Sequence, residues 1–88
     1  MNGIGTNTDK KIAFEYFKKS AKRGYSAGIN NLGNSYQYGI GTDINKRKAF
    51  ELYQKAANLD NMEAQYNLAY MYEIGDEIEK DIDQAIFW

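Results

Sequence analysis

The sequence predicts an all-α solenoid of antiparallel helix hairpins, and three observations lead to this prediction. The 88-residue chain repeats at an interval of 36 residues: Gly-Ile-Gly-Thr at 3–6 returns at 39–42, and Ala-Phe-Glu at 13–15 returns at 49–51. Small and apolar residues between these motifs recur at helical spacing. Glycines punctuate the pattern, and proline is absent. A fixed period of this length is typical of solenoids, whose units bury their apolar faces only against neighbouring units.

The spacing of apolar residues predicts five helices. They are residues 9–23, 27–38, 45–59 and 63–74, followed by a last helix from near Asp81 to Trp88. The stripes that define the first four are, in order, Ala13, Phe17, Ser20 and Ala21; Ile29, Leu32, Gly33 and Tyr36; Ala49, Tyr53, Ala56 and Ala57; and Ala64 or Gln65, then Leu68, Ala69 and Tyr72. Small residues such as Gly33 and Ala69 would let paired helices approach closely.

Polar residues and glycines at repeated positions predict where the helices begin and end. Short polar side chains can accept hydrogen bonds from the free N–H groups of a first helical turn. The expected N-terminal residues of this kind are Asp9, Ser26, Asn45, Asn61 and Asp81. The expected closing residues are Gly24 and Asp60, and the expected turn glycines are Gly39, Gly41 and Gly75. Glycine suits these turns because positive φ costs it little.

We call the 27–38 type of segment helix A and the 45–59 type helix B, so that one unit is an A–B hairpin. On this division residues 1–88 are a single domain, with a partial unit at 1–25, a whole unit at 26–61 and a partial unit at 62–88. A stable solenoid needs about three repeats. We therefore expect either an excerpt of a longer array or a chain whose ends another surface covers.

Composition argues against most catalytic and metal chemistry. The chain has no cysteine and no histidine, so it lacks thiolate ligands, disulfides and the usual general base near neutral pH. We expect no catalytic residue, no metal and no cofactor. The Gly-x-Gly motifs lack the preceding strand and the further glycine or Lys-Ser/Thr of a phosphate loop. An acidic run lacks the calcium-loop pattern and favours a solvated turn; it comprises Asp76, Glu77, Glu79, Asp81 and Asp83.

Charge and hydropathy set the expected surroundings of the protein. The net charge is −1, which argues against nucleic acid as a partner. No apolar run approaches the roughly 18 residues of a membrane span, and the N-terminus shows no signal-peptide core. We therefore expect a soluble protein, cytoplasmic by default.

The charges are unevenly distributed along the chain. Residues 1–25 contain two acids, Asp9 and Glu15, and six basic residues: Lys10, Lys11, Lys18, Lys19, Lys22 and Arg23. Residues 61–88 contain one base, Lys80, and seven acids: Glu63, Glu73, Asp76, Glu77, Glu79, Asp81 and Asp83. In a solenoid this order becomes a basic end and an acidic end. Two solvated faces and head-to-tail docking by complementary charge both account for it.

The assembled pattern resembles the Sel-1-like repeat family, a relative of the tetratricopeptide repeat. The matching residues of the middle unit are Asn31, Leu32, Gly33, Tyr36, Gly39, Gly41, Asn45, Lys48, Ala49, Tyr53, Lys55, Ala56 and Ala57. Those of the next unit are Ala64, Asn67, Leu68, Ala69, Tyr72, Gly75, Ile78, Asp81, Ala85 and Trp88. The first unit matches at Gly3, Gly5, Asp9, Ala13, Phe17, Lys19, Ala21 and Gly24. Asp60 stands where the pattern has a closing glycine.

The resemblance implies a right-handed superhelix that acts as a non-catalytic adaptor or scaffold for a partner protein or peptide. An alternative is a structural fragment of a longer array that self-associates, as a homo-oligomer or end to end through uncapped ends. A remote alternative is a hydrolase of the β-lactamase-like kind, because some cysteine-rich secreted members of the family have been linked to β-lactams. The absence of cysteine here makes those members a poor guide.

The candidate partner-binding residues lie on helix A, on the face expected to be concave. They are Asn30, Asn34 and Tyr38, and one period later Tyr66, Tyr70 and Ile74. The last three are spaced i, i+4 and i+8, which places them along one side of a helix. Exposed tyrosines suit partner anchoring, although stacking between neighbouring helices explains the same positions equally well. Asn31 and Asn67 recur together, and we expect their amides to bond to an inter-helix turn.

Overall fold

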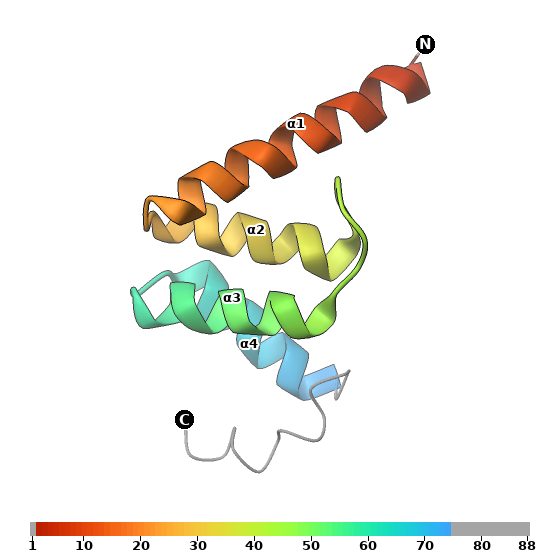
Figure 1. Cartoon of the computed structure of the whole chain (residues 1–88). Helices are drawn as coiled ribbons and strands as arrows, with labels where there is room; N and C mark the ends of the chain where they lie inside the picture. Colours follow the sequence, from red (N-terminus) through yellow and green to blue (C-terminus); the bar gives the residue numbers. More distant parts are fainter. Residues whose placement is uncertain (1, 75–88) are drawn as a thin grey trace.

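The computed structural model describes the backbone of residues 2–74 and the side chains of residues 8–74 as a stack of four α-helices. These are α1 (Asn2–Lys22), α2 (Ser26–Tyr38), α3 (Lys46–Asn58) and α4 (Met62–Ile74). Each helix packs mainly on the one before it and the one after it, as Figure 1 shows for α1, α2, α3 and α4. No strand occurs within residues 2–74, and the all-α solenoid prediction is confirmed. The last predicted helix and the acidic run lie outside the described residues.

Two small clusters of side chains form the core between the helices. One contains Ala49, Phe50, Tyr53 and Met71, with Tyr36, Leu68 and Tyr72 packed against it. The other contains Ile29, Ala56 and Ala64, with Ala21, Leu52 and Ala57 packed against it. Both clusters join residues from consecutive helices, as expected for units that bury their apolar faces only against neighbours.

The 36-residue period appears directly in the packing. The rings of Phe14 and Tyr36 meet edge to face with centroids 5.5 Å apart, and those of Phe50 and Tyr72 do so at 5.6 Å. The second pair therefore repeats the first, one unit later, between a helix B and the following helix A. Equivalent residues of the repeat make equivalent contacts.

Helices α2 and α3 approach each other closely at Gly33. A Cβ atom at this position would lie 2.8 Å from the ring of Tyr53, closer than real Cβ contacts allow, and 3.4 Å from the carbonyl oxygen of Ala49. The predicted close approach of small residues is thus confirmed for Gly33. Ala69, its equivalent in α4, is exposed.

Most of the predicted helix ends are confirmed. Gly24, Gly39 and Asp60 all have positive φ, at 86°, 70° and 67°. The Asn45 Oδ1 atom accepts a 3.0 Å hydrogen bond from the backbone N–H of Lys48. The Asn61 Oδ1 atom likewise accepts one from the N–H of Ala64 at 2.8 Å. Both asparagines therefore satisfy free N–H groups of a first helical turn.

The N-terminal end of α1 differs from the prediction. Residues 3–6, expected in a turn, are helical, and Asp9 lies inside α1 and is not its cap. The equivalent loop after α2 is held in place by that helix: Ile40 N–H donates to the Ser35 carbonyl at 2.9 Å, and Asn45 N–H donates to the Tyr36 carbonyl at 2.8 Å.

The start of α2 also differs from the prediction. Its N-cap is Tyr25, which makes no side-chain hydrogen bond to the first turn, and Ser26 is already helical. Gly24 takes the left-handed conformation and leaves Tyr25 extended, so the helix begins directly afterwards. The Ser26 hydroxyl instead accepts a long hydrogen bond, 3.5 Å, from Nδ2 of Asn61.

Replacing Asp60 by glycine is expected to stabilise the fold. Asp60 holds a left-handed φ of 67°, a conformation that costs most L-residues about 1–2 kcal/mol. Its carboxylate also lies just beyond the negative end of the α3 dipole. Urea unfolding should therefore give Asp60→Gly a free energy of unfolding higher by about 1 kcal/mol. Asp60→Asn removes the charge alone and should recover a smaller part; a glycine variant no more stable than wild type would contradict the expectation.

Replacing Gly33 by leucine is expected to destabilise the fold by about 1–3 kcal/mol, the usual cost of overpacking. The new side chain would collide with the Tyr53 ring. The matched control is Ala69→Leu at the equivalent position one period later, where the residue is exposed and no contact of this kind occurs among the described residues. Urea unfolding of both variants measures the difference. Equal losses would show that the α2–α3 approach is not the cause.

Candidate protein-binding surface

A network of amides joins the two A helices and contains two of the predicted binding residues. Asn67 Nδ2 donates to Asn30 Oδ1 at 3.0 Å and, at 3.4 Å, to Asn34 Oδ1. Asn30 Nδ2 in turn donates to Glu63 Oε1 at 3.2 Å. The Asn30 side chain is 1% exposed. Both the Nδ2 donor and the Oδ1 acceptor of Asn30 are therefore hydrogen-bonded to side chains of α4. Buried amides usually have such partners, and Asn30 is not exposed to solvent.

Tyr53 extends this network into α3. Its hydroxyl donates a short 2.6 Å hydrogen bond to Asn34 Oδ1, so that Asn34 links α2 to both α3 and α4. The structural role predicted for Asn67 is confirmed, but its partners are side chains of α2 and not an inter-helix turn. Gln37, also on α2, is buried, and its Oε1 atom receives no hydrogen bond from the described residues.

The other four predicted residues lie on the surface. Tyr66 is 72% exposed, Tyr70 and Ile74 are each 43% exposed, and Tyr38 at the end of α2 is also exposed. Helical spacing brings Tyr66, Tyr70 and Ile74 to one side of α4; we call these three residues the α4 tyrosine face. Tyr66 and Tyr70 stand one period after Asn30 and Asn34, yet α4 covers the asparagines and no described helix covers the tyrosines.

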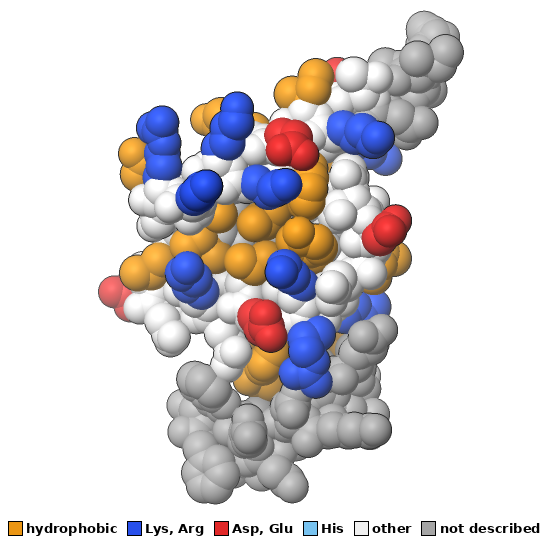
Figure 2. Space-filling model, viewed as in Figure 1, with side chains coloured by type: hydrophobic (Ala, Val, Ile, Leu, Met, Phe, Trp, Pro, Cys, Tyr) orange, Lys and Arg blue, Asp and Glu red, His pale blue; other side chains and the backbone are white. Residues whose placement is uncertain are grey.

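The two ends of the helix stack differ in charge. The charged residues of α4 are Glu63 and Glu73, and α2 carries none. Lys and Arg side chains spread over α1 and α3 on either side of a band of hydrophobic side chains (Figure 2). The α4 tyrosine face is thus apolar with acidic neighbours, whereas the opposite end is basic.

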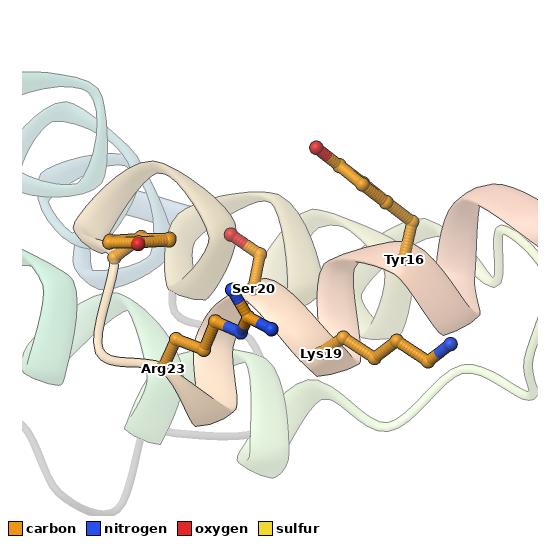
Figure 3. Close-up of a pocket in the computed structure, with 5 residues that line it drawn as sticks. Tyr16, Lys19, Ser20 and Arg23 are labelled. Carbon is orange, nitrogen blue, oxygen red and sulfur yellow. The ribbon is translucent and has the colours of Figure 1, made fainter.

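Two pockets lie along α1, where no binding site was predicted. One of about 240 Å³ is lined by Tyr16, Lys19, Ser20, Arg23 and Tyr25. Figure 3 shows Lys19 and Arg23 extending along the helix surface while Tyr16 and Ser20 project from it. The other, of about 370 Å³, is lined by Thr8, Lys11, Ile12, Glu15, Tyr16 and Lys19. The sequence signal that could have indicated these pockets is the exposed pair Ile12 and Tyr16, spaced i and i+4.

The described residues contain no cluster of metal-ligating side chains and no helix that could span a membrane. No group of three or more acidic side chains gathers closely enough between residues 2 and 74 to hold a metal ion. Among the same residues, no helix is both long and apolar enough to cross a membrane. The two pockets are lined by hydroxyls and cations and, in the larger one, also by the carboxylate of Glu15.

Comparison with protein families decides the class of the chain. A family model described as Sel1 repeat matches residues 1–25, 26–61 and 63–88. The chain belongs to the Sel1 repeat family. Sel1 repeats generally mediate protein–protein interactions, and their all-helical fold is typically not enzymatic. Comparison with curated proteins and with solved structures found no match.

In this Sel1 repeat chain the phenol of Tyr53 has a perturbed pKa. Burial, and in second place the neighbouring Tyr38, raise the pKa of Tyr53 well above its ordinary value of 10.0. The folded chain therefore retains the phenolic proton at a pH where the unfolded chain loses it. The stability that follows from this pKa shift is fully present below pH 10, and it declines as the pH rises further, because at first only the unfolded chain ionises.

Alkaline unfolding tests this interpretation. Above about pH 10, wild type should lose up to about 1.4 kcal/mol more stability per pH unit than Tyr53→Phe, which cannot ionise. The comparison with the variant cancels the lysines, which titrate in the same range. Urea unfolding at about pH 9 and about pH 11 measures both slopes. Parallel losses in the two proteins would show that Tyr53 is not protected from ionisation in the fold.

Proposed function

We propose that this Sel1 repeat protein is a non-catalytic adaptor that binds a partner protein or peptide on its helix A face, through the α4 tyrosine face. The observation that carries the proposal is the contrast between equivalent positions. The side chains of Asn30 and Asn34 form hydrogen bonds between α2 and α4, whereas Tyr66 and Tyr70 are large, rigid and exposed.

Tyrosine is well suited to this role. It offers a large contact area with few rotatable bonds and a hydroxyl for a directional bond, and it is enriched among the residues that dominate binding energy. Tyr66 and Tyr70 belong to α4. Contacts with α3 and the amide network hold this helix in place. A preorganised surface of this kind loses little side-chain entropy on binding.

The surroundings of the α4 tyrosine face define the partner's chemistry. With Glu63 and Glu73 on α4 and no basic residue on α2 or α4, the surface favours an apolar segment that carries a positive charge. A lysine or arginine of the partner would also gain from stacking on an exposed tyrosine ring. Asn34 contributes indirectly, because its side chain already bonds to Tyr53 and Asn67.

Affinity capture with the immobilised chain, followed by mass spectrometry, would identify the partner, and alanine variants would then locate its site. Tyr66→Ala and Tyr70→Ala should each weaken binding about tenfold or more, since truncating a binding hot spot costs about 2 kcal/mol. Ile44→Ala is the control, because Ile44 is 59% exposed in the loop between α2 and α3, outside α4. If Tyr70→Ala leaves the affinity unchanged within error, the site is not the α4 tyrosine face.

A second candidate function is that of a structural segment whose exposed faces pack on further helices. It rests on the same equivalence: α4 covers Asn30, so another helix A would cover Tyr66. The uneven charge along the sequence adds the case of head-to-tail self-association. Light scattering at high concentration and low salt decides on the latter: a mass that rises with concentration and falls with salt supports it, whereas a constant monomer mass excludes it.

A further inference from the structure

One face of α1 is more exposed than the equivalent residues of α3. Tyr53 is 1% exposed, and Ala49 and Ala56 lie fully buried beside it. One period earlier, Phe17, Ala13 and Ser20 are only partly covered. The residues next to them are more exposed still, with Tyr16 at 68%. We call this surface the α1 open face; it comprises Ile12, Ala13, Tyr16, Phe17 and Ser20.

The packing of α2 on α3 shows what kind of element fits such a face. Helix α2 places Gly33 directly on the Tyr53 ring and Ile29 on the cluster around Ala56. The two helices run antiparallel, since Asn45, which caps the start of α3, bonds to Tyr36 near the end of α2. Because the repeat reproduces its contacts elsewhere, this arrangement predicts the occupant of the equivalent surface.

We propose that the α1 open face binds an amphipathic α-helix of a partner protein, antiparallel to α1, with acidic residues in its first turn and glycine or alanine at its centre. This surface lies at the opposite end of the stack from the α4 tyrosine face, so the proposal is independent of the function proposed above. The small central residue follows from the position of Gly33: the equivalent of Tyr53 in α1 is Phe17, an aromatic ring of nearly the same size.

The acidic first turn follows from charge. Lys19 and Arg23 lie at the C-terminal end of α1, in the pocket that Tyr16, Ser20 and Tyr25 complete. Neither cation forms a salt bridge with an acidic residue of the described chain. An antiparallel helix would place its N-terminus at this end. Carboxylates in its first turn would interact favourably with these cations and with their own helix dipole.

One difference between the two faces sharpens the expected sequence. The Tyr53 hydroxyl donates to Asn34, the residue that follows Gly33. Phe17 has no hydroxyl, so an asparagine at the corresponding position of the occupant would gain no partner on α1 and would lose solvation. We expect an apolar residue there. The α1 open face thus selects a helix that is related to α2 but differs from it in two respects: it has an acidic first turn, and it has an apolar residue at the position of Asn34.

A synthetic peptide built on α2 tests the proposal against the full chain. The probe has the sequence of residues 25–38 with Ser26→Asp, Ala27→Glu and Asn34→Leu, and a cross-link between positions 31 and 35 keeps it helical on the side away from Gly33. A dye at its C-terminus reports binding by fluorescence anisotropy. We expect saturable binding, weakened about tenfold or more when the peptide also carries Gly33→Leu.

Variants of the protein locate the site. Tyr16→Ala and Ile12→Asp should each weaken binding of the probe about tenfold or more. Both residues are exposed, so the fold should be retained, and circular dichroism checks this directly. Tyr66→Ala is the matched control, with the same substitution and a similar exposure, and it should leave probe affinity unchanged. This variant also separates the proposal from the α4 tyrosine face.

Three results would overturn the proposal. The first is the absence of saturable binding to the wild-type chain. The second is equal affinity of the parent and Gly33→Leu peptides, which would show that the basic surface merely attracts acidic ligands. The third is unchanged affinity in both Tyr16→Ala and Ile12→Asp, which would place the probe elsewhere on the molecule.

Discussion

The contact between Gly33 and the ring of Tyr53 is the constraint on which the rest of the structure depends. It brings α2 and α3 so close that no side chain fits between them at this point. The same tyrosine then donates its hydroxyl to Asn34, and Asn34 accepts a further bond from Asn67 of α4. The Asn34 side chain thereby connects three consecutive helices. The α2–α3 hairpin therefore offers α4, the first helix of the following unit, a surface in a fixed register.

This constraint also determines which surfaces remain open. Because Asn30 and Asn34 turn towards α4, the partner-binding surface proposed here contains the tyrosines of α4 and not a continuous ladder along both A helices. At the other end, α1 carries the aromatic and small residues that α3 buries, together with Lys19 and Arg23. The two surfaces differ in charge, and they would therefore select different partners.

Much of the fold follows from the sequence, because the roles of repeated residues that act locally can be predicted without knowing which residues lie near them in space. Gly24, Asp60, Asn45 and Asn61 act within a few residues of themselves, and all four were predicted correctly. The start of α1 was predicted incorrectly: residues 3–6 are helical, although the same motif forms a loop after α2. The burial of Asn30 could likewise not be predicted from the sequence, because it depends on α4, whose Glu63 lies 33 residues further along the chain.

The most direct test of this account is the proximity of Gly33 to Tyr53 in solution. In an isotopically labelled chain, nuclear Overhauser effects should connect the Gly33 Hα protons to the Tyr53 ring, and the ring current should shift those protons from their usual position. The pairs Phe14 with Tyr36 and Phe50 with Tyr72 should give matching effects one period apart. Absence of the Gly33–Tyr53 effect in a folded helical chain would contradict the central claim.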